Sequence, residues 1–362
     1  MNGYTQTDLN PPAADEVEFS LFGPGFGECV VCHIGSAQWV IVDSCLDPAT
    51  KEPVALKYLE SLGVAVDSAI AAIVSTHWHD DHIKGLSRIL EAAPAARYAV
   101  TSAFDKADFR AALSQWMDGS SDLEGKGFSE LRRIMSLKRH PILAGENKII
   151  FERSAPPKCQ VLALSPSDAA VIACISKLAD IPKTKFRRRM PEMKGNHASV
   201  VLSIEVENRR LLLGGDLQVR EDRKFGWLAV VDTHKEFGRS KHHVFKVPHH
   251  GSANADDPEI WTHLLELEPH AVLAPFIRGK EKLPTAEDTA RIKQSAGRAF
   301  ITARPTTEKF HHPKPSVEKT MREGTRSLEV IPHRFGHVRL RGRLSEDPQA
   351  WRVEHFGDAQ QL

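Results

Sequence analysis

The sequence predicts a layered α/β fold, and three observations support this prediction. The composition is that of an ordinary globular chain, with 41% hydrophobic and 26% charged residues among 362, which argues against a disordered or fibrous protein. Apolar runs of strand length recur along the chain, and none approaches the roughly 18 residues that span a bilayer. Segments with helical periodicity lie between these runs, as expected for a fold that layers helices on sheets.

The early part of the chain predicts three strands, a helix and a further strand. The strands are Val17–Phe22, Glu28–Ile34, Gln38–Val42 and Ser68–Ser75. Each is a short apolar run bounded by turn residues. The helix, Pro53–Leu62, has apolar residues at helical spacing and ends at a glycine.

A similar alternation of strands and helices occupies the later part of the chain. The predicted strands are Val161–Leu164, Ser199–Val206, Arg210–Leu213, His243–Val247, Ala271–Ala274 and Ala299–Thr302. The predicted helices are Pro258–Leu267 and Ala286–Ser295. This mixture favours a layered α/β body over an all-helical or all-β one.

Two segments stand apart from this pattern and shape the expected domain organisation. Ala103–Leu137 is helical and charge-rich, and it separates the early and late parts of the chain. The last sixty residues contain a linker, Thr306–Ser316, and two strand-like pieces, Gly336–Leu340 and Trp351–Phe356. We therefore expect one main domain over residues 1–303, with a helical insertion at about 103–137, and a C-terminal extension, 304–362, whose short strands pack on it.

Charge and cysteine usage narrow the class of protein. Lys and Arg number 48 against 47 Asp and Glu, so bulk charge does not hold this chain to a polyanion, although the basic cluster Lys183–Arg189 is a local exception. The five scattered cysteines fit reduced cytosolic thiols better than a disulfide framework. Without the basic and apolar segments of a secretory leader, we expect a soluble cytoplasmic protein with no membrane partner. Nothing in the sequence indicates an oligomeric state.

The strongest chemical motif is HWHDDH at residues 77–82, directly after a predicted buried strand. Imidazole nitrogens and carboxylate oxygens are good ligands for Zn²⁺ and related ions. His77 and His79, two residues apart, can turn to one side and share a metal ion. Asp81 and His82 are offset from them and would reach a second ion nearby. The other interpretation, a solvated histidine-rich loop, fits this spacing poorly.

This HxHxDH string resembles the metallo-β-lactamase superfamily. The resemblance implies an αββα sandwich, here with a helical insertion and a C-terminal extension, and a dinuclear metal site at one edge. It further implies that Asp43 in WVIVDSC supports the metal loop, that His197 is a middle ligand and that Asp216 in LLLGGD bridges the two ions.

The same resemblance implies a late histidine ligand, matched in VPHHGS by His249 or His250. We favour His250, because superfamily nucleases place this ligand at the third position after the strand-ending valine. His249 would then orient a ligand or contact substrate, a role also open to Asn196 and Ser199. The alternative for His249 is a partly exposed structural histidine.

A finer resemblance covers roughly residues 17–303. The strings VLALSPS, NHASVVLSI, LLLGGDL and KVPHHGS look like the nuclease-like domain of the ComEC/Rec2 competence proteins and their stand-alone relatives. One departure is His197, where that subfamily commonly has Asp. The insertion at 103–137 is another, and it is either a substrate cap or a solvated decoration.

These resemblances imply a metal-dependent hydrolase. The metal ligands that they imply are His77, His79, Asp81, His82, His197, Asp216 and His250. Of these, we expect Asp81 and His250 to be catalytic. Two divalent ions, Zn²⁺ first and Mn or Fe as alternatives, would lower the pKa of a shared water, and the resulting hydroxide would be the nucleophile.

The expected substrate is a phosphodiester, in nucleic acid or a nucleotide derivative. The cluster Lys183–Arg189 would contact its phosphates, unless it is a solvated face. The alternative is a thioester, lactone or β-lactam hydrolase using the same site, although the GHTxG-type string of glyoxalase-like members is absent around His197. A catalytically silent binding protein is a third hypothesis, which the complete set of candidate ligands disfavours.

Overall fold

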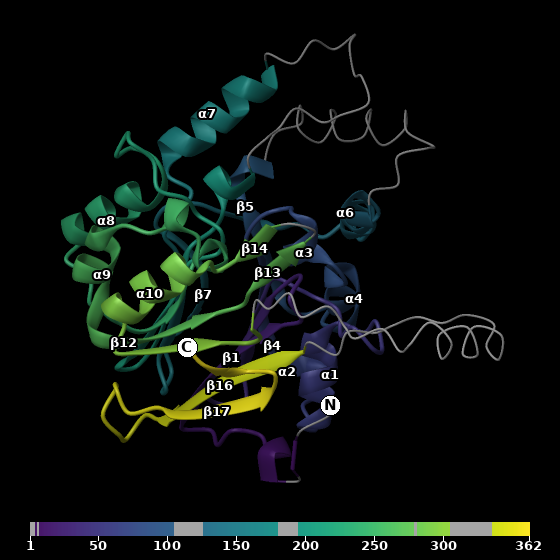
Figure 1. Cartoon of the computed structure of the whole chain (residues 1–362). Helices are drawn as coiled ribbons and strands as arrows, with labels where there is room; N and C mark the ends of the chain where they lie inside the picture. The colour runs from purple at the N-terminus through teal and green to yellow at the C-terminus, as the bar shows by residue number, and fades with distance from the viewer. Residues whose placement is uncertain (1–3, 6, 105–125, 180–194, 279–280, 305–334) are drawn as a thin grey trace, which may run out of the picture.

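The computed structural model describes the whole chain except residues 1–3, 6, 105–125, 180–194, 279–280 and 305–334. Two large β-sheets lie face to face, and helices cover the outer face of each sheet (Figure 1). The predicted αββα sandwich is thereby confirmed. The segments Lys183–Arg189 and Thr306–Ser316 lie outside the described residues, as does most of the predicted insertion.

The first sheet contains eight strands among the described residues, in the order β17-β16-β1-β2-β3-β4-β5-β6. Their bounds are β1 Glu16–Gly23, β2 Cys29–Ile34, β3 Trp39–Val42, β4 Ile70–Ser75, β5 Arg97–Thr101, β6 Ile142–Ala144, β16 Gly336–Arg343 and β17 Arg352–Gly357. Strands β3 to β6 run parallel to one another. Strand β16 pairs antiparallel with β1 along its whole length, so an early and a late segment of the described chain lie side by side in one sheet.

The second sheet also has eight described strands, in the order β18-β15-β12-β11-β10-β9-β8-β7. Their bounds are β7 Lys148–Arg153, β8 Cys159–Ala163, β9 Leu202–Val206, β10 Arg209–Leu213, β11 His242–Lys246, β12 Leu265–Leu273, β15 Arg298–Ile301 and β18 Gln360–Gln361. Strands β10, β11, β12 and β15 are parallel. A separate hairpin is formed by β13 Phe276–Arg278 and β14 Glu281–Leu283.

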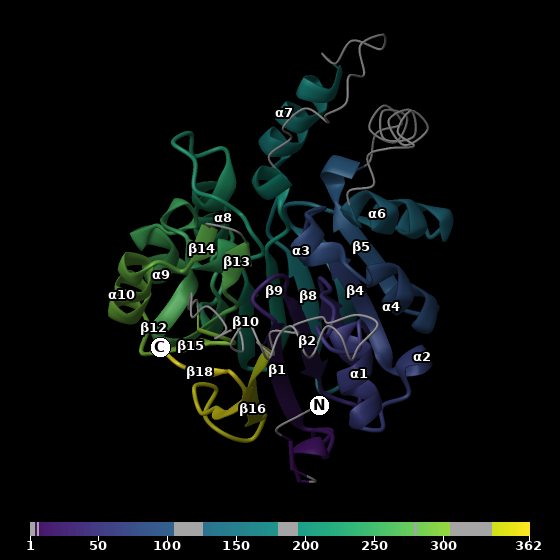
Figure 2. The same ribbon diagram turned by 45° about the vertical axis from the view of Figure 1, so that its right-hand side comes forward.

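The helices divide between the two outer faces, as Figure 2 shows. The first sheet is covered by α1 Val54–Ser61, α4 Leu86–Ala92 and α6 Lys126–Ser136, with the short α2 Val66–Ala69 and α3 Asp80–Ile83 beside them. The second sheet is covered by α8 Gly226–Glu236, α9 Pro258–Leu264 and α10 Ala286–Ser295, whereas α7 Asp168–Ala179 projects from one end of the sandwich. Single 3-10 turns are found at Thr7–Leu9, Ser102–Phe104, Gly195–Ala198, His249–Gly251 and Ala253–Ala255. Among these described helices, none combines the length and the apolar character needed to cross a bilayer.

Both faces of the central strands are buried, which explains their continuous apolar runs. In β2, Val30 and Cys32 face the opposite sheet, whereas Cys29 and Val31 pack toward the helices on the other side. The alternation follows from the two-residue period of a strand. It also places Cys29 and Cys32, which are three residues apart, on opposite faces of the sheet, where both are free and buried.

The described parallel strands place the candidate site residues together. β3, β4, β10 and β11 are followed directly by loops that carry Asp43, His77, Asp216 and His250. Because the carboxyl ends of parallel strands meet at one edge of a sheet, and the two sheets are stacked, these loops converge at one edge of the sandwich. The fold therefore assembles the site from segments more than 200 residues apart.

Several predicted boundaries are wrong: the strands predicted at Ser199–Val206 and Ala271–Ala274 begin at Leu202 and Leu265, and two others also differ from the prediction. The helix predicted at Pro258–Leu267 ends at Leu264, because the buried Leu265 already pairs with the start of β11 and belongs to β12. The strand predicted at Ser68–Ser75 begins at Ile70, after the short helix α2. In both cases sheet pairing decides the boundary, which local periodicity does not report.

Candidate metal centre

The HWHDDH segment leaves the sheet at the end of β4 and becomes α3 after His79, whose backbone is extended. His77 and His82 are completely buried, and Asp81 is 8% exposed. His79 and Asp80 are half-buried. The segment therefore presents most of its polar side chains to the interior, where each needs a partner.

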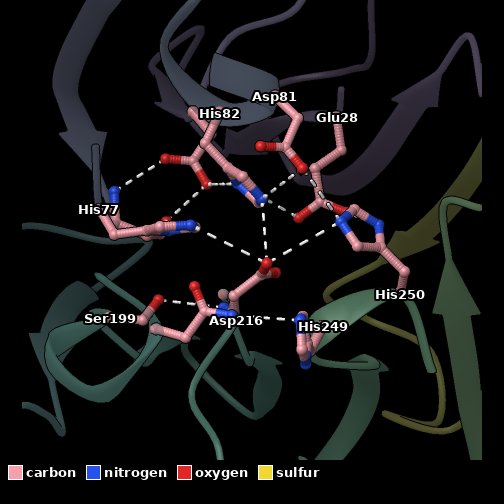
Figure 3. A network of polar contacts seen from close by, with 12 residues as sticks. Glu28, His77, Asp81, His82, Ser199, Asp216, His249 and His250 are labelled. Carbon is pink, nitrogen blue, oxygen red and sulfur yellow. Dashed lines mark hydrogen bonds and ion pairs between the residues drawn. The ribbon is translucent and has the colours of Figure 1, made fainter. Parts of the chain in front are cut away.

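Four side chains bring one ligand atom each within 4.8 Å of one another: Asp81, His82, Asp216 and His250. Nε2 of His82 lies 3.4 Å from Oδ2 of Asp216, and Nε2 of His250 lies 3.4 Å from Oδ2 of Asp81. Figure 3 shows the two imidazoles and two carboxylates pointing toward a common centre. Such a group of nitrogen and oxygen donors is suited to a divalent cation.

His77 lies beside Asp216 and His82, and His79 lies beside His77. Nε2 of His77 is 3.9 Å from Oδ2 of Asp216, and the rings of His77 and His79 are 4.6 Å apart between centroids. The same carboxylate oxygen thus lies near Nε2 of His77, His82 and His250, and the rings of His77 and His82 are 4.2 Å apart between centroids.

Each buried histidine of the cluster has its Nδ1 atom tied to a protein acceptor. Nδ1 of His82 donates to Asp43 Oδ2 at 2.7 Å, and Nδ1 of His250 donates to the carbonyl of Ala274 at 3.1 Å. Nδ1 of His77 donates to Thr76 Oγ1, which in turn donates to Asp43. With a proton held on Nδ1, Nε2 is the atom that each imidazole, once neutral, can offer to a metal ion.

The free atoms that remain fit a metal centre. Nε2 of His77, His82 and His250 and Oδ1 of Asp216 are buried and have no hydrogen-bond partner among the described residues. Buried polar atoms without partners are rare, because each costs about 1–3 kcal/mol. Four that converge on one centre match the donors that divalent cations require.

The electrostatics of the cluster also call for a cation. Burial lowers the pKa of His77 well below its usual range, which keeps this imidazole neutral and able to bind metal. Burial alone would raise the pKa of Asp216, but His82 and His250 outweigh it and hold that pKa well below the ordinary value. Asp216 in turn outweighs burial and raises the pKa of His82 and of His250, so these two imidazoles supply positive charge that a bound divalent ion would replace.

Glu28 and Lys246 form a buried ion pair beside the cluster that the sequence did not identify as part of the site. Both side chains are at most 2% exposed, and Nζ of Lys246 also donates to the carbonyl of Gly215 at 3.0 Å. Glu28 Oε2 lies 3.7 Å from Nδ1 of His250. A lysine inside the apolar strand β11 was the available clue, since buried lysines need a partner. The pairing also removes Lys246 from the residues that could contact a surface phosphate.

Asp216 is held by a close approach of three chain segments. The preceding Gly215 has a positive φ of 49°, and a Cβ atom there would lie 2.5 Å from Ser199 Oγ. Ser199 Oγ accepts a hydrogen bond from the Asp216 backbone N–H at 3.0 Å. Ser199, predicted to lie near the site, therefore positions the loop that carries Asp216. Position 215 requires glycine, because a side chain there would collide with Ser199.

His249 and His250 both have left-handed backbone conformations, with φ of 47° and 54°. Two consecutive non-glycine residues in this region store roughly 1–3 kcal/mol each, a strain that clusters at functional sites. The conformation turns the two imidazoles to different partners. His250 enters the metal cluster, whereas Nε2 of the half-buried His249 lies 3.1 Å from Nδ2 of Asn196.

His197 takes a different position from the other predicted ligands. It lies in the 3-10 turn Gly195–Ala198, is half-buried, and its Nε2 atom is 3.2 Å from Nη1 of Arg220. The metal-capable groups found among the described residues contain neither His197 nor the pair His77 and His79. The sequence-based ligand role of His197 stays a prediction.

Comparison with known proteins gives a family and several similar folds. The family model described as the metallo-beta-lactamase superfamily matches residues 22–151. No curated protein matches the chain. Similar solved structures include the metallo-beta-lactamase fold protein YhfI from Bacillus subtilis, with 10% identity, 71% of this chain and 85% of that chain covered, and a TM-score of 0.36.

Two further structures show the same level of similarity. A HARLDQ-motif mutant of a metallo-beta-lactamase from Cronobacter sakazakii has 14% identity, covers 63% of this chain and 75% of its own, and has a TM-score of 0.33. A putative metallo-beta-lactamase from Thermotoga maritima has 16% identity, covers 53% of this chain and 68% of its own, and has a TM-score of 0.31.

The matched region 22–151 contains the whole HWHDDH segment and its supporting Asp43. The sandwich fold and the buried cluster of histidines and aspartates are what a metal-dependent hydrolase of this kind requires. The family model matches only part of the chain, and together with the sandwich fold and the buried cluster it suggests a metal-dependent hydrolase.

Proposed function

We propose that this protein is a phosphodiesterase or nuclease that uses two divalent ions at the edge of the sandwich. The observation that carries the proposal is the convergence of unpartnered ligand atoms on Asp216 from His77, His82 and His250. In this arrangement His77 and His79 would hold the first ion. Asp81, His82 and His250 would hold the second, and Asp216 would contact both.

Bound there, two divalent ions would supply a water of lowered pKa as nucleophile and stabilise the charge of an in-line displacement. The chain's own groups keep the ligands in place for this chemistry. Asp43 and Thr76 fix the imidazoles of His77 and His82 with Nε2 facing the centre. Asp81 and His250, predicted to be catalytic, lie opposite Asp216 and would define the second half of the centre.

The nature of the ligands supports Zn²⁺ as the first choice of ion. Three or more imidazoles with carboxylates suit zinc, but the same donors also accept Mn²⁺ or iron. The metal content of the purified protein decides among them.

Phosphodiesters are favoured as substrates by the ComEC-like strings, which supply Asp216 and His250 as well as the turn at Asn196. The guanidinium of Arg220 is exposed four residues after Asp216 and is a candidate contact for a phosphate oxygen. Nucleic acid is the proposed macromolecular substrate, and a smaller nucleotide-derived diester would use the same contacts.

One observation favours the alternative, hydrolysis of a thioester, lactone or β-lactam. A cavity of about 570 Å³ lies beside the metal loop, and its lining includes Trp78, Tyr98, Leu131 and Ile134. A mainly apolar cavity of this size would accept an acyl chain or an aromatic group. The carbonyl substrates therefore belong in the same assay as the phosphodiesters.

The test is a parallel assay of the purified, metal-analysed protein on bis(p-nitrophenyl) phosphate, single- and double-stranded DNA, RNA, a thioester, a lactone and a cephalosporin. We expect phosphodiester turnover that is abolished by chelation and reduced at least about 100-fold in Asp81→Ala and His82→Ala. Turnover of a carbonyl substrate without phosphodiester turnover would establish the alternative. Full activity of Asp81→Ala would contradict the two-ion centre.

A further inference from the structure

The buried amide of Asn196 has an oxygen without a partner. Asn196 lies in the 3-10 turn Gly195–Ala198 and is only 8% exposed. Its Oδ1 atom has no hydrogen-bond partner among the described residues. A buried carboxamide oxygen is a strong acceptor, so its isolation indicates a group that is bound at this point.

The orientation of this amide is set by two neighbours. Nδ1 of His249 lies 2.7 Å from Oδ1 of Asn254 and 3.5 Å from Nε2 of Gln218. The shorter contact is to a carboxamide oxygen, which can only accept, so Nδ1 carries the proton of His249. Nε2 of His249 is then an acceptor, which receives the N–H of Asn196 at 3.1 Å. The Oδ1 atom of Asn196 is therefore the end of the amide that is turned away from His249.

The turn that carries Asn196 is attached directly to the metal loops. The N–H of Val200 donates to the carbonyl of Thr76 at 3.0 Å, next to His77. Ser199 Oγ accepts from the backbone of Asp216 at 3.0 Å. The N–H of Ser199 also donates to the carbonyl of Asn196 at 3.3 Å, so Asn196 is tied to the residues that contact the segments of His77 and the shared carboxylate.

The side chain of the adjacent His197 has a different hydrogen-bond partner. Its Nε2 atom faces the guanidinium of Arg220 at 3.2 Å, and a guanidinium only donates. The lone pair of that nitrogen is consequently used by Arg220. The two neighbouring side chains therefore differ in the one property that a metal ligand needs, a free lone pair.

We infer that Asn196, rather than His197, is the third protein ligand of the first ion, through its amide oxygen, beside His77 and His79. His249 and Asn254 act as positioning residues that keep this oxygen turned toward the ion. The inference rests on the proposed two-ion centre. A neutral oxygen in place of a third imidazole makes this site more accepting of Mn²⁺ than a three-histidine site.

Metal counting separates the two candidates without an activity assay. Wild type, Asn196→Ala, Asn196→Asp and His197→Ala are loaded with Zn²⁺, desalted and analysed for metal per chain, and Co²⁺ absorption spectra report the ligand field. We expect two ions in the wild type, in His197→Ala and in Asn196→Asp, whose carboxylate oxygen replaces the amide. Asn196→Ala retains one ion.

Asn254→Ala provides a second measurement, because Asn254 is exposed and acts only through His249. We expect this variant to bind the first ion about 10- to 100-fold more weakly, as for other groups that orient a ligand, with a changed Co²⁺ spectrum. Its melting temperature in chelator should match that of the wild type.

Three results would overturn the inference. They are two ions in Asn196→Ala, loss of one ion in His197→Ala, and unchanged first-ion affinity in Asn254→Ala. Fewer than two ions in the wild type would instead contradict the proposed two-ion centre itself. Since each outcome is read from metal content or affinity, failure of the phosphodiester assay alone would leave the ligand assignment standing.

Discussion

At the residue scale, the chain's 18 histidines are distinguished by what remains free on each ring. His242 uses both nitrogens, one on Ser203 and one on the carbonyl of Leu264, and it is a structural residue. His77 and His82 use only Nδ1, and the free Nε2 atoms meet near Asp216. One free ring nitrogen does not by itself identify a metal ligand, because His270 also has a buried nitrogen without a hydrogen-bond partner. Convergence of several free donors is what separates a ligand from a buried structural histidine.

The buried pair of Glu28 and Lys246 shows how the cluster is kept charged. Burial alone would lower the pKa of Lys246, but Glu28 and Asp216 raise it, so the ammonium remains protonated. It contacts Glu28 and the carbonyl before Asp216. Lys246 therefore links the loop at the start of β2 to the loop of the shared carboxylate.

Removing this ammonium should destabilise the protein. Lys246→Met leaves the Glu28 carboxylate buried without its cation, and we expect a loss of about 3–5 kcal/mol in the free energy of unfolding. Urea unfolding in excess chelator measures this loss separately from metal binding. The double variant Glu28→Gln/Lys246→Met should recover most of it, and Lys241→Met, near the surface, is the matched control. A single variant as stable as the wild type would show that the pair is unimportant.

At the element scale, α10 supports the loop that carries the late histidines. Its N-terminus is closed by a capping box in which Thr285 and Asp288 each bond the other's backbone N–H. One turn later, Arg291 donates to the carbonyl of Gly251 and pairs with Asp256. Ile292 lies against Gly251 from the same helix. The helix thus fixes the residue that directly follows His250.

Loss of the cap should cost stability without changing metal binding. In Thr285→Ala the N–H of Asp288 loses its acceptor, and we expect about 1 kcal/mol less free energy of unfolding. Thr289→Ala, in the same helix, is the matched control, because its hydroxyl bonds only the Thr285 carbonyl. Chemical denaturation compares the two. Equal effects from both substitutions would argue that helix propensity, rather than the cap, determines the change.

At the scale of the whole molecule, the sequence predicted the layered fold better than the side-chain contacts between segments that are distant in the chain. The motif at residues 77–82, Asp43, Asp216 and His250 could be located because each follows a recognisable apolar strand. Glu28 could not, because its role depends on the approach of β2 to β11 in space. Asn196 and His197 are adjacent in the chain, so only the direction of each side chain distinguishes them. Long-range contacts and side-chain direction are the information that local patterns lack.

The same three-dimensional packing produces buried histidines away from the metal centre, and these set the acid stability of the molecule. His242 is 1% exposed, donates from Nδ1 to the Leu264 carbonyl at 2.8 Å and accepts at Nε2 from Ser203. Burial lowers its pKa to about 3. The folded protein therefore keeps this ring neutral at pH values where the unfolded chain protonates it.

This difference makes the folded state less stable as the pH falls. The stabilisation is complete above about pH 6.5, the ordinary histidine value, and is lost progressively toward the folded pKa of about 3. Two pH units below 6.5, at pH 4.5, the loss due to His242 alone is about 2–3 kcal/mol. In His242→Gln, which keeps hydrogen-bonding groups but does not titrate, the free energy of unfolding should fall by that much less between pH 6.5 and 4.5. Urea unfolding in chelator at several pH values measures the two slopes, and the exposed His140→Gln should follow the wild type. Parallel slopes for wild type and His242→Gln would mean that His242 does not resist protonation in the folded protein, and that acid sensitivity originates elsewhere.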